Sequence, residues 1–486
     1  MNEASKDISI LQNYVVTQEK EVDEALKKQL NKLNRKIIVL DDDPTGIQTV
    51  NEVSVYTEWS KESILKGFKE KNNMFFILTN SRALTEAETA AVHKEIAENI
   101  VWVSRETGKE FILISRGDST LRGHFPLETK TLREEIEKNF DIKYSGEIIM
   151  PFFKEGGRYT LDNVHYVKYD SSLVPAGETE FSKDKTFGFS SSHLGEWCQE
   201  KSNGKNKVQD MVYITLEDLR SHNKDVIIKK LLEVENFDKI IVNAIDYYDV
   251  KIFTNCLIDC ILEGKEFIYR TAAAFPKIIG GVNHKDLLTR KDIISKDNSN
   301  GGIILVGSHV KKTTLQLEYM MNNIQEIEFI EFDVSKVSEE GGLESEVERV
   351  LKLLESTVLD GRTVTVYTSR KLLQVETEDK NKILEASVKI SNSLVNIIGK
   401  LSVRPSFIIA KGGITSSDVG TKALQVKKAK VMGQVKPGIP VWMTGDESKF
   451  PEMPYVIFPG NVGETSTLGE IAEMLIEKGE ANDDHQ

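Results

Sequence analysis

Short, uninterrupted apolar runs alternate with amphipathic stretches along most of the chain, and several runs lead directly into polar clusters. In the first half such runs are found at 37–40 (IIVL), 75–78 (FFIL) and 111–114 (FILI), and helical spacing follows at 85–105 and 126–139. Apolar runs of this length, separated by helical stretches, are typical of parallel strands buried on both faces. The pattern therefore predicts an α/β fold.

The same rhythm restarts after a polar, turn-forming segment at 295–302 (SKDNSNGG). Because 486 residues exceed one ordinary core, we expect two α/β domains. Each should be a mostly parallel sheet flanked by helices, with the active site in the cleft between them. The predicted parts are an N-terminal helical extension at 1–34, a first domain at 35–294 and a second domain at 302–480.

Two segments depart from this rhythm. Residues 8–33 are polar, with apolar positions at roughly helical spacing, which predicts a helix lying across the main domain or at a dimer contact. Residues 154–192 are rich in Gly, Ser and Asp and show little periodicity. Loops of that length are usually functional, so we expect a substrate-covering element there. A homodimer is suggested only by the size of the chain and by the N-terminal helix.

Composition narrows the class of protein. A net charge of −13 argues against a broad nucleic-acid or anionic-membrane surface. Cys198, Cys256 and Cys260 cannot make a disulfide framework, and the last two fit buried thiols on one helix face. There is no Cys-x-x-Cys or His-x3-His pattern for structural zinc. Without a signal-peptide pattern or an apolar run of transmembrane length, a cytoplasmic protein is expected.

The first candidate chemistry is the acidic turn Asp41–Gly46, which directly follows the 37–40 run. Consecutive carboxylates are costly to bury unless cations or donors face them. At the mouth of a crevice they could accept a hydroxyl proton, bind substrate hydroxyls or hold a metal. A solvated acidic turn is the alternative interpretation.

Arginines and hydroxyls follow the next two runs. Arg82 comes after 75–78, and Arg116 and Arg122 lie in the cluster after 111–114. Carboxyl ends of parallel strands form the ligand-binding edge of such a sheet, and the arginine fork matches carboxylate or phosphate oxygens. The polar residues between the last two arginines are Asp118, Ser119 and Thr120. Carboxylates beside arginines suit a small substrate that carries both a carboxylate and hydroxyls, namely a sugar acid.

Three glycine-containing turns lie in the second half. They are Gly307-Ser308, Lys411–Ser417 and Pro459–Gly463. Glycines at strand-to-helix turns let backbone N–H groups approach phosphate oxygens, and a helix N-terminus favours anions. The turns match no P-loop or dinucleotide fingerprint. Together they predict a site for a nucleotide or another polyphosphate, with ordinary tight turns as the alternative.

Taken in order, these segments resemble the four-carbon acid sugar kinase family. The resemblance runs from about residue 36 to about residue 475. Five motifs carry it: Asp42-Asp43-Pro44-Thr45-Gly46, Arg116-Gly117-Asp118-Ser119-Thr120-Leu121-Arg122-Gly123, Gly307-Ser308 with Thr313 and Gln316, Gly412-Gly413-Ile414-Thr415, and Gly460-Asn461-Val462-Gly463. Pro44 and Val310 depart from residues common in the family, which leaves the substrate more open than the reaction.

The resemblance implies ATP-dependent phosphorylation of a four-carbon acid such as threonate, erythronate or an oxo-tetronate. One of Asp42 and Asp43 would be the catalytic base, and Mg²⁺ would arrive on the ATP phosphates rather than in a protein cage. The residues implied to contact the acid are Asp42, Asp43, Arg82, Arg116, Asp118, Ser119, Thr120 and Arg122. Those implied to contact ATP are Ser308, Gly412, Gly413, Ile414, Thr415, Gly460, Asn461 and Gly463.

Two other functions remain open from the sequence. Asp41-x-Asp43-x-Thr45 after a buried strand, followed by FFILTNS at 75–81, is similar to the first two motifs of haloacid-dehalogenase-type phosphatases, in which Asp41 would be a nucleophile and Asp43 the acid/base. That family has no counterpart for the Asp118–Gly123 segment or for the glycine-rich second domain. The non-enzymatic alternative is a sugar-acid sensor that has lost phosphoryl transfer.

Overall fold

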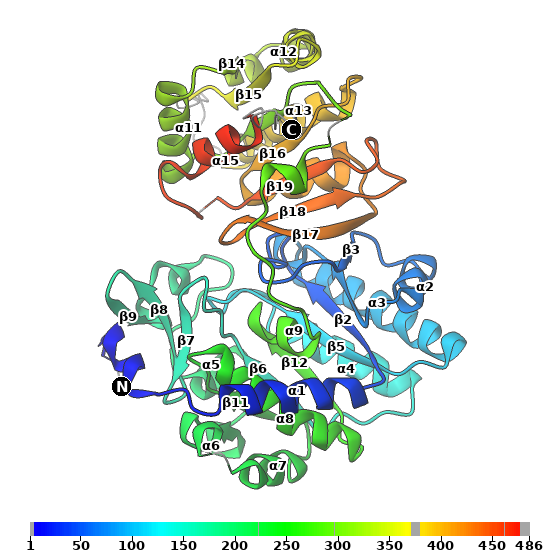
Figure 1. Cartoon of the computed structure of the whole chain (residues 1–486), viewed down its shortest axis with the longest axis vertical. Coiled ribbons are helices and arrows are strands. Elements are labelled where there is room, and N and C mark those ends of the chain that lie inside the picture. Colours follow the sequence, from blue (N-terminus) through cyan, green and yellow to red (C-terminus); the bar gives the residue numbers. More distant parts are fainter. Residues whose placement is uncertain (1–3, 222, 296, 371–379, 461, 477–486) are drawn as a thin grey trace, which may run out of the picture. The chain divides into compact units, whose positions relative to one another are not determined.

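The computed structural model of the chain describes residues 4–221, 223–295, 297–370, 380–460 and 462–476. Contacts divide it into two units, Met1–His284 and Lys285–Gln486. Each is α/β, with a largely parallel sheet between helices (Figure 1), as predicted. The polar 295–302 segment lies within the second unit. Residues just before it belong there too, since the Leu288 N–H donates to Gln434 O at 2.7 Å.

The first unit is built on a sheet in which every neighbouring pair of strands is parallel. In spatial order its strands are β10 (Val212–Ile214), β11 (Asp238–Val242), β6 (Gly146–Met150), β12 (Phe267–Thr271), β5 (Phe111–Arg116), β2 (Lys36–Asp41), β4 (Met74–Leu78) and β3 (Ser54–Tyr56). The central strands β2, β4 and β5 are buried along their whole length. This explains their continuous apolar runs and confirms the three strands predicted from them.

Helices cover both faces of this sheet. On one face Ile64 of α2 (Lys61–Lys69), Ile96 of α3 (Glu86–Thr107) and Leu132 of α4 (Leu127–Asn139) join the core formed with Ile38, Leu40 and Phe75. On the other face Tyr269 stacks on Phe275 of α9 (Ala274–Ile279), which contacts Phe253 of α8 (Tyr247–Leu262). The remaining helices are α5 (Leu194–Lys201), α6 (Leu216–Arg220) and α7 (Lys224–Leu232).

Residues 154–192 are not the irregular segment that the sequence suggested. They form an antiparallel sheet of β7 (Arg158–Leu161), β8 (Val164–Tyr169) and β9 (Ser172–Pro175), followed by the short helical turns η3 (Ala176–Glu178) and η4 (Glu180–Lys183). Asp162 and Asn163, both with positive φ, form the tight turn between the first two strands. Most of β7 and β8 is buried, so the two-residue alternation that reveals half-buried strands is missing.

The N-terminal helix is shorter than its apolar spacing predicted. Only α1 (Glu19–Lys32) is α-helical, and it packs against α8 (Figure 1). Before it, β1 (Lys6–Asp7) pairs with β9, and η1 (Ile8–Asn13) follows. Gln18 has φ 55°, which breaks the helical path, and Val15 is 70% exposed.

The second unit has a mixed sheet. In spatial order its strands are β17 (Lys428–Lys436), β18 (Ile439–Thr444), β19 (Pro454–Phe458), β16 (Ile408–Lys411), β13 (Ile303–Val306), β15 (Thr363–Thr368) and β14 (Ile327–Phe332). The hairpin β17–β18 and the pair β18–β19 are antiparallel, and the pairs from β19 to β14 are parallel.

Helices flank this sheet as well. Leu317 of α11 (Lys311–Asn323) and Leu468 of α15 (Thr467–Ile476) share a core with strand residues such as Ile304, Ile409 and Val456. The remaining helical elements are α10 (Arg290–Ile293), η6 (Val334–Ser338), α12 (Gly342–Leu359), α13 (Lys380–Lys400), α14 (Gly413–Asp418) and the π-helical turn η7 (Val419–Ala423). The alternation of strands and helices predicted for the second half is therefore present in the described residues.

The cysteines and the helix lengths can also be compared with the expectations from the sequence. Cys198, Cys256 and Cys260 are buried free thiols, and the last two lie in α8 as predicted. Among the described residues, no helix combines the length and the apolar character needed to cross a bilayer.

Arg220 ties the segment before α1 to the first unit. Its guanidinium holds the Asp249 carboxylate at 2.8 and 3.0 Å and donates to Tyr14 O at 2.9 Å. The Asp249 side chain is fully buried. Arg220→Met should lower the free energy of unfolding, measured in urea, by about 3 kcal/mol, because it leaves a buried carboxylate without its cation. The control Lys229→Met removes an exposed pair with Glu233 and should change it by less than about 1 kcal/mol; equal losses would contradict this account.

Candidate functional site

The acidic turn lies at the carboxyl edge of the first sheet. Strand β2 ends at Asp41, and its neighbours β4 and β5 end beside it, so Asp41 pairs in register with Leu78 and Arg116. Thr79 fastens this corner, because its backbone N–H and its hydroxyl both donate to Asp41 O at 2.9 Å. Parallel pairing therefore brings together clusters that are far apart in the sequence, as expected.

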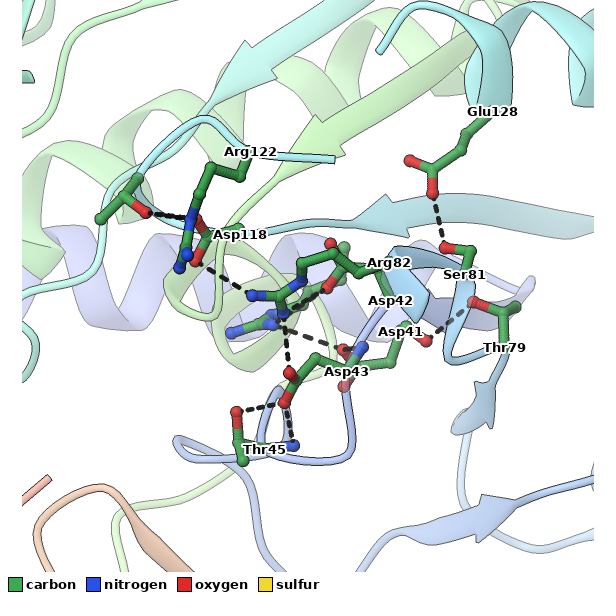
Figure 2. Close-up of polar contacts among 12 residues, drawn as sticks. Asp41, Asp42, Asp43, Thr45, Thr79, Ser81, Arg82, Asp118, Arg122 and Glu128 are labelled. Carbon is green, nitrogen blue, oxygen red and sulfur yellow. Dashed lines mark hydrogen bonds and ion pairs between the residues drawn. The ribbon is translucent and has the colours of Figure 1, made fainter. Parts of the chain in front are cut away.

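Arg82 lies at the centre of the cluster. Figure 2 shows the carboxylates of Asp42, Asp43 and Asp118 around its guanidinium. The Nη2 atom of Arg82 is 3.2 Å from Asp42 Oδ1 and 3.0 Å from Asp43 Oδ2. Its Nη1 atom is 3.6 Å from Asp118 Oδ1. These ion pairs raise the pKa of Arg82 further above its ordinary value despite burial. Arg82 thus links the acidic turn after β2 to the polar cluster after β5.

Arg116 supplies the second buried cation. Its Nη1 lies 3.3 Å from Asp41 Oδ1 and 3.7 Å from Asp42 Oδ1. Asp41 and Asp42 are both 1% exposed. Their Oδ2 atoms are buried without a hydrogen-bond partner among the described residues. Each of these two carboxylates therefore has one oxygen held by arginine and one oxygen left over.

The loop after β5 is organised by Asp118. Its Oδ2 accepts from Arg122 Nε at 2.8 Å and from the Thr120 hydroxyl. Burial raises the pKa of the Asp118 carboxyl, but Arg82 and Arg122 outweigh burial and hold it well below its usual range. The Ser119 carbonyl accepts from His165 Nε2 at 2.8 Å. His165 comes from β8, so the small antiparallel sheet is fastened to this loop.

The structure adds Arg270 and Glu128, which the sequence analysis did not single out, and joins them to Ser81 of the 75–81 segment. Arg270 Nη1 lies 2.8 Å from Glu128 Oε2, and the Ser81 hydroxyl donates to Glu128 Oε1 at 2.6 Å (Figure 2 shows the latter bond). Arg270 ends the apolar run 267–269 (FIY), so the strand-end signal used for the other arginines was present there. Its position next to β5 required the strand order.

Two glycines make room for Arg270. A Cβ added at Gly117 would lie 1.9 Å from Arg270 Nη1, and one added at Gly123, where φ is +117°, would lie 2.7 Å from Nη2. The guanidinium therefore occupies the space that side chains at these positions would take. Its Nη2 also donates to Arg122 O at 3.0 Å. The packing of Arg270 thus explains why residues 117 and 123, on either side of Asp118-Ser119-Thr120, are glycines.

The three adjacent aspartates differ electrostatically. Burial raises the pKa of Asp42, although Arg82, Arg270 and Arg116 pull it down. Asp43 is only partly buried, with its side chain 23% exposed, and Arg82 and the hydrogen bonds from Thr45 outweigh burial and lower its pKa. Burial raises the pKa of Asp41 to about 7 against the opposing effect of Arg116. The surroundings thus raise the pKa of Asp41 and Asp42 and lower that of Asp43, within one turn.

Asp41 is also covered by its own turn. A Cβ at Gly46 would come within 2.0 Å of both Asp41 carboxylate oxygens, so the Gly46 backbone packs directly over the carboxylate. The Asp43 N–H donates to Asp41 Oδ1 at 3.3 Å. Asp41 therefore faces the chain rather than a ligand.

In the second unit the three glycine turns follow neighbouring parallel strands. Gly307-Ser308 follows β13, Gly412-Gly413 follows β16 and Gly460 follows β19. A Cβ at Gly412 would lie 3.3 Å from the Ser308 Cβ, so the first two turns are close. At Gly413 and Gly460 it would meet nothing within 4 Å. These turns can therefore admit an oxygen-rich ligand near their backbone N–H groups.

A cavity of about 500 Å³ opens beside these strand ends. It is lined by Gly307, His309, Thr314, Val334, Thr368, Arg370, Ser387, Ile390, Ser391, Leu394 and Thr415. Its size suits a small cofactor. Arg370, which the sequence analysis missed, donates to Ser308 O at 2.6 Å and keeps Nε and Nη2 buried without partners among the described residues.

Two buried side chains hold the last turn. Lys411 Nζ donates to Pro459 O at 2.7 Å and Gly460 O at 3.2 Å. Gln316 Nε2 donates to Val462 O at 3.2 Å and Glu464 O at 2.8 Å. Burial lowers the pKa of Lys411 to about 7.

Of the remaining predicted nucleotide contacts, Ile414 lies in α14, Thr415 lines the cavity, and Gly463, with φ +81°, packs against Thr467. Asn461 lies outside the described residues. Within the described residues, no group of three or more His, Cys, Asp and Glu side chains is arranged to hold a metal ion.

The raised pKa of Asp41 has a consequence for stability. Between its ordinary value of 3.8 and about 7, the folded protein keeps a proton that the unfolded chain has lost. The stability from this group therefore falls as pH rises through that window. Asp41→Asn cannot lose the proton. Its midpoint of thermal unfolding relative to wild type should thus be higher at pH 8 than at pH 5, by an amount equivalent to about 3 kcal/mol.

The matched control is Asp141→Asn, which alters an exposed carboxyl in the same unit. It should give the same difference from wild type at both pH values. A pH-independent difference for Asp41→Asn as well would contradict the assigned titration.

Comparison with known proteins supports a division of labour between the units. Residues 37–279 match the family described as the sugar-binding N-terminal domain, and residues 303–468 match the nucleotide-binding C-terminal domain. None of the curated proteins compared with the chain matches it.

Two solved structures share the fold. The Haemophilus influenzae protein HI1011, described as a DUF1537 member, has a TM-score of 0.60 at 16% identity, covering 90% of this chain and 100% of its own. A Salmonella typhimurium LT2 protein, described as a candidate tRNA synthase, has a TM-score of 0.66 at 15% identity, covering 89% and 97%. With its two domain matches, the chain belongs to the family of proteins that join a sugar-binding N-terminal domain to a nucleotide-binding C-terminal domain.

Proposed function

We propose that the protein is an ATP-dependent kinase that phosphorylates a hydroxyl of a four-carbon sugar acid, of the threonate, erythronate or 3-oxo-tetronate type. One observation carries the proposal. In the sugar-binding domain, Asp42 has a buried carboxylate oxygen without a partner among the described residues, while arginines hold its other oxygen. A substrate hydroxyl would satisfy that oxygen. The nucleotide-binding domain would supply the phosphoryl donor.

Asp42 is the better candidate for the catalytic base. A base works best when its pKa lies near the working pH, and burial raises the pKa of Asp42. Asp43 is held ionised by Arg82 and Thr45, so its role in this proposal is to fix Arg82 and to orient the hydroxyl. Asp42 would accept the hydroxyl proton as the oxygen attacks the γ-phosphoryl group.

Phosphoryl transfer depends mainly on alignment and on stabilising charge at the moving group. The glycine turns of the second unit would hold the ATP phosphates through Ser308, Gly412–Thr415 and Gly460–Gly463. Mg²⁺ would be carried by those phosphates, which is its usual mode of binding in kinases.

The burial of Asp41 argues against the phosphatase alternative. A nucleophilic aspartate must reach a substrate phosphorus, but the Asp41 carboxylate is 1% exposed and lies under Gly46. The non-catalytic sensor remains an alternative. The buried Asp42, with one carboxylate oxygen free of partners among the described residues, favours the kinase, because sensing an acid does not require a base.

The first experiment follows ADP release across the D and L forms of threonate and erythronate and their oxo derivatives. Turnover should occur with one acid or a closely related pair, and only with ATP and Mg²⁺ present. Binding of an acid without ADP release would favour the sensor. Release of phosphate from a phosphorylated acid without ATP would favour the phosphatase.

Substitutions in the acidic turn test whether Asp42 or Asp43 is the catalytic base. Asp42→Asn should lower kcat about 10²- to 10⁴-fold, because the amide cannot accept the hydroxyl proton. The affinity for ATP, measured by calorimetry, should stay within about twofold, because the nucleotide site is in the other unit. The matched variant Asp43→Asn should lower kcat less. A larger loss in Asp43→Asn than in Asp42→Asn would reverse the assignment of the base.

A further inference from the structure

The arginines that the sequence offered for a substrate carboxylate already hold carboxylates of the protein. Arg82 pairs with Asp42, Asp43 and Asp118, and Arg116 pairs with Asp41 and Asp42. The other two are engaged as well: Arg122 with Asp118 and Asp184, and Arg270 with Glu128. A cation that is already compensated attracts a further anion only weakly. The substrate carboxylate therefore needs another partner.

Arg158 differs from these four. It is half-buried at the start of β7 and forms no ion pair with any carboxylate of the described residues. Nη1 donates to the nearby Gly156 carbonyl. Nε is buried without a hydrogen-bond partner in the part of the chain described, as is Nε of Arg82 and of Arg116, so the missing ion pair is what sets Arg158 apart. Burial, the largest effect, lowers its pKa, as expected for a cation without a compensating charge. A half-buried arginine with an idle donor is costly unless an anion binds it.

Arg158 lies at the edge of the site already described. Its guanidinium is 5.6 Å from the Phe181 ring centroid, and that of Arg122 is 5.1 Å from the same centroid. Asp118, which accepts from Arg122, is the strongest favourable charge acting on Arg158. Phe181 thus places the unpaired arginine beside the Asp118 loop, on the small antiparallel sheet.

We propose that Arg158 is the residue that binds the carboxylate of the substrate, so that the small antiparallel sheet selects acids over neutral sugars. This rests on the proposed function, since it assigns one end of the sugar acid to Arg158 and a hydroxyl to Asp42. The planar fork of an arginine matches the two oxygens of a carboxylate. Arg122 and Phe181 position Arg158.

The test combines a change in the protein with the same change in the ligand. Calorimetry measures the binding of D- and L-erythronate and D- and L-threonate, and of their neutral amides, to wild type and to Arg158→Met. The variant should bind the preferred acid about ten- to hundredfold more weakly, the usual effect of losing a charged hydrogen bond. Its affinity for the amide should be unchanged, and it should no longer prefer the acid.

Two further variants guard against misinterpretation. Arg133→Met removes another arginine above a phenylalanine ring: the Arg133 guanidinium, on α4, is 4.2 Å from the Phe237 ring centroid. This variant should leave acid binding unchanged. Arg158→Lys keeps the charge and should restore part of the preference for the acid. If Arg158→Met weakens acid and amide equally, or lowers kcat without raising the KM for the acid, the proposal is wrong.

Failure of this inference and failure of the proposed function can be told apart. A wild-type protein that binds an acid without ADP release overturns the kinase, and the same affinities still decide the role of Arg158. A wild-type protein that turns over the acid while Arg158→Met keeps its preference overturns only the role of Arg158. Absence of binding by every acid overturns both.

Discussion

The arrangement of the site depends on the compensation of buried carboxylates by arginines at the carboxyl edge of the first sheet. Asp41 and Asp42 are almost completely buried, and a carboxylate in such surroundings is tolerated only when cations and donors face it. Arg116 comes from the neighbouring strand β5, and Arg82 from the turn after β4, the neighbour on the other side. The order of the strands β12, β5, β2 and β4 therefore places the arginines close enough to compensate the buried carboxylates.

Glycines, which have no side chain, allow the close packing of the charged groups. Gly117 and Gly123 leave the space that the Arg270 guanidinium fills, and Gly46 lets the backbone lie against the Asp41 carboxylate. Arg270 in turn holds Glu128, which accepts from Ser81 next to Arg82. Glycines that look like ordinary turn residues in the sequence thus determine how closely the charged groups can approach one another. The same principle applies in the second unit, where Gly412 approaches Ser308.

Much of the fold could be predicted from the sequence, because strands buried on both faces appear as uninterrupted apolar runs. The strand-end clusters located Asp42, Arg82 and Arg116 for the same reason. Arg270 and Arg158 were missed for different reasons. The neighbours of Arg270 depend on a strand order that a linear pattern does not contain. Arg158 lies in the β7–β8 hairpin, where burial on both faces removes the alternation that indicates strands.

The small antiparallel sheet has its own means of holding its shape, apart from the charged cluster that it adjoins. Its hairpin turns at Asp162 and Asn163, and one of its attachments is His165, whose imidazole bridges Thr160 Oγ1 and the Ser119 carbonyl. Burial lowers the pKa of His165 to about 4, so this attachment stays uncharged at neutral pH. A module of this kind can diversify during evolution, or be exchanged by design, while the acidic turn beneath it keeps its geometry.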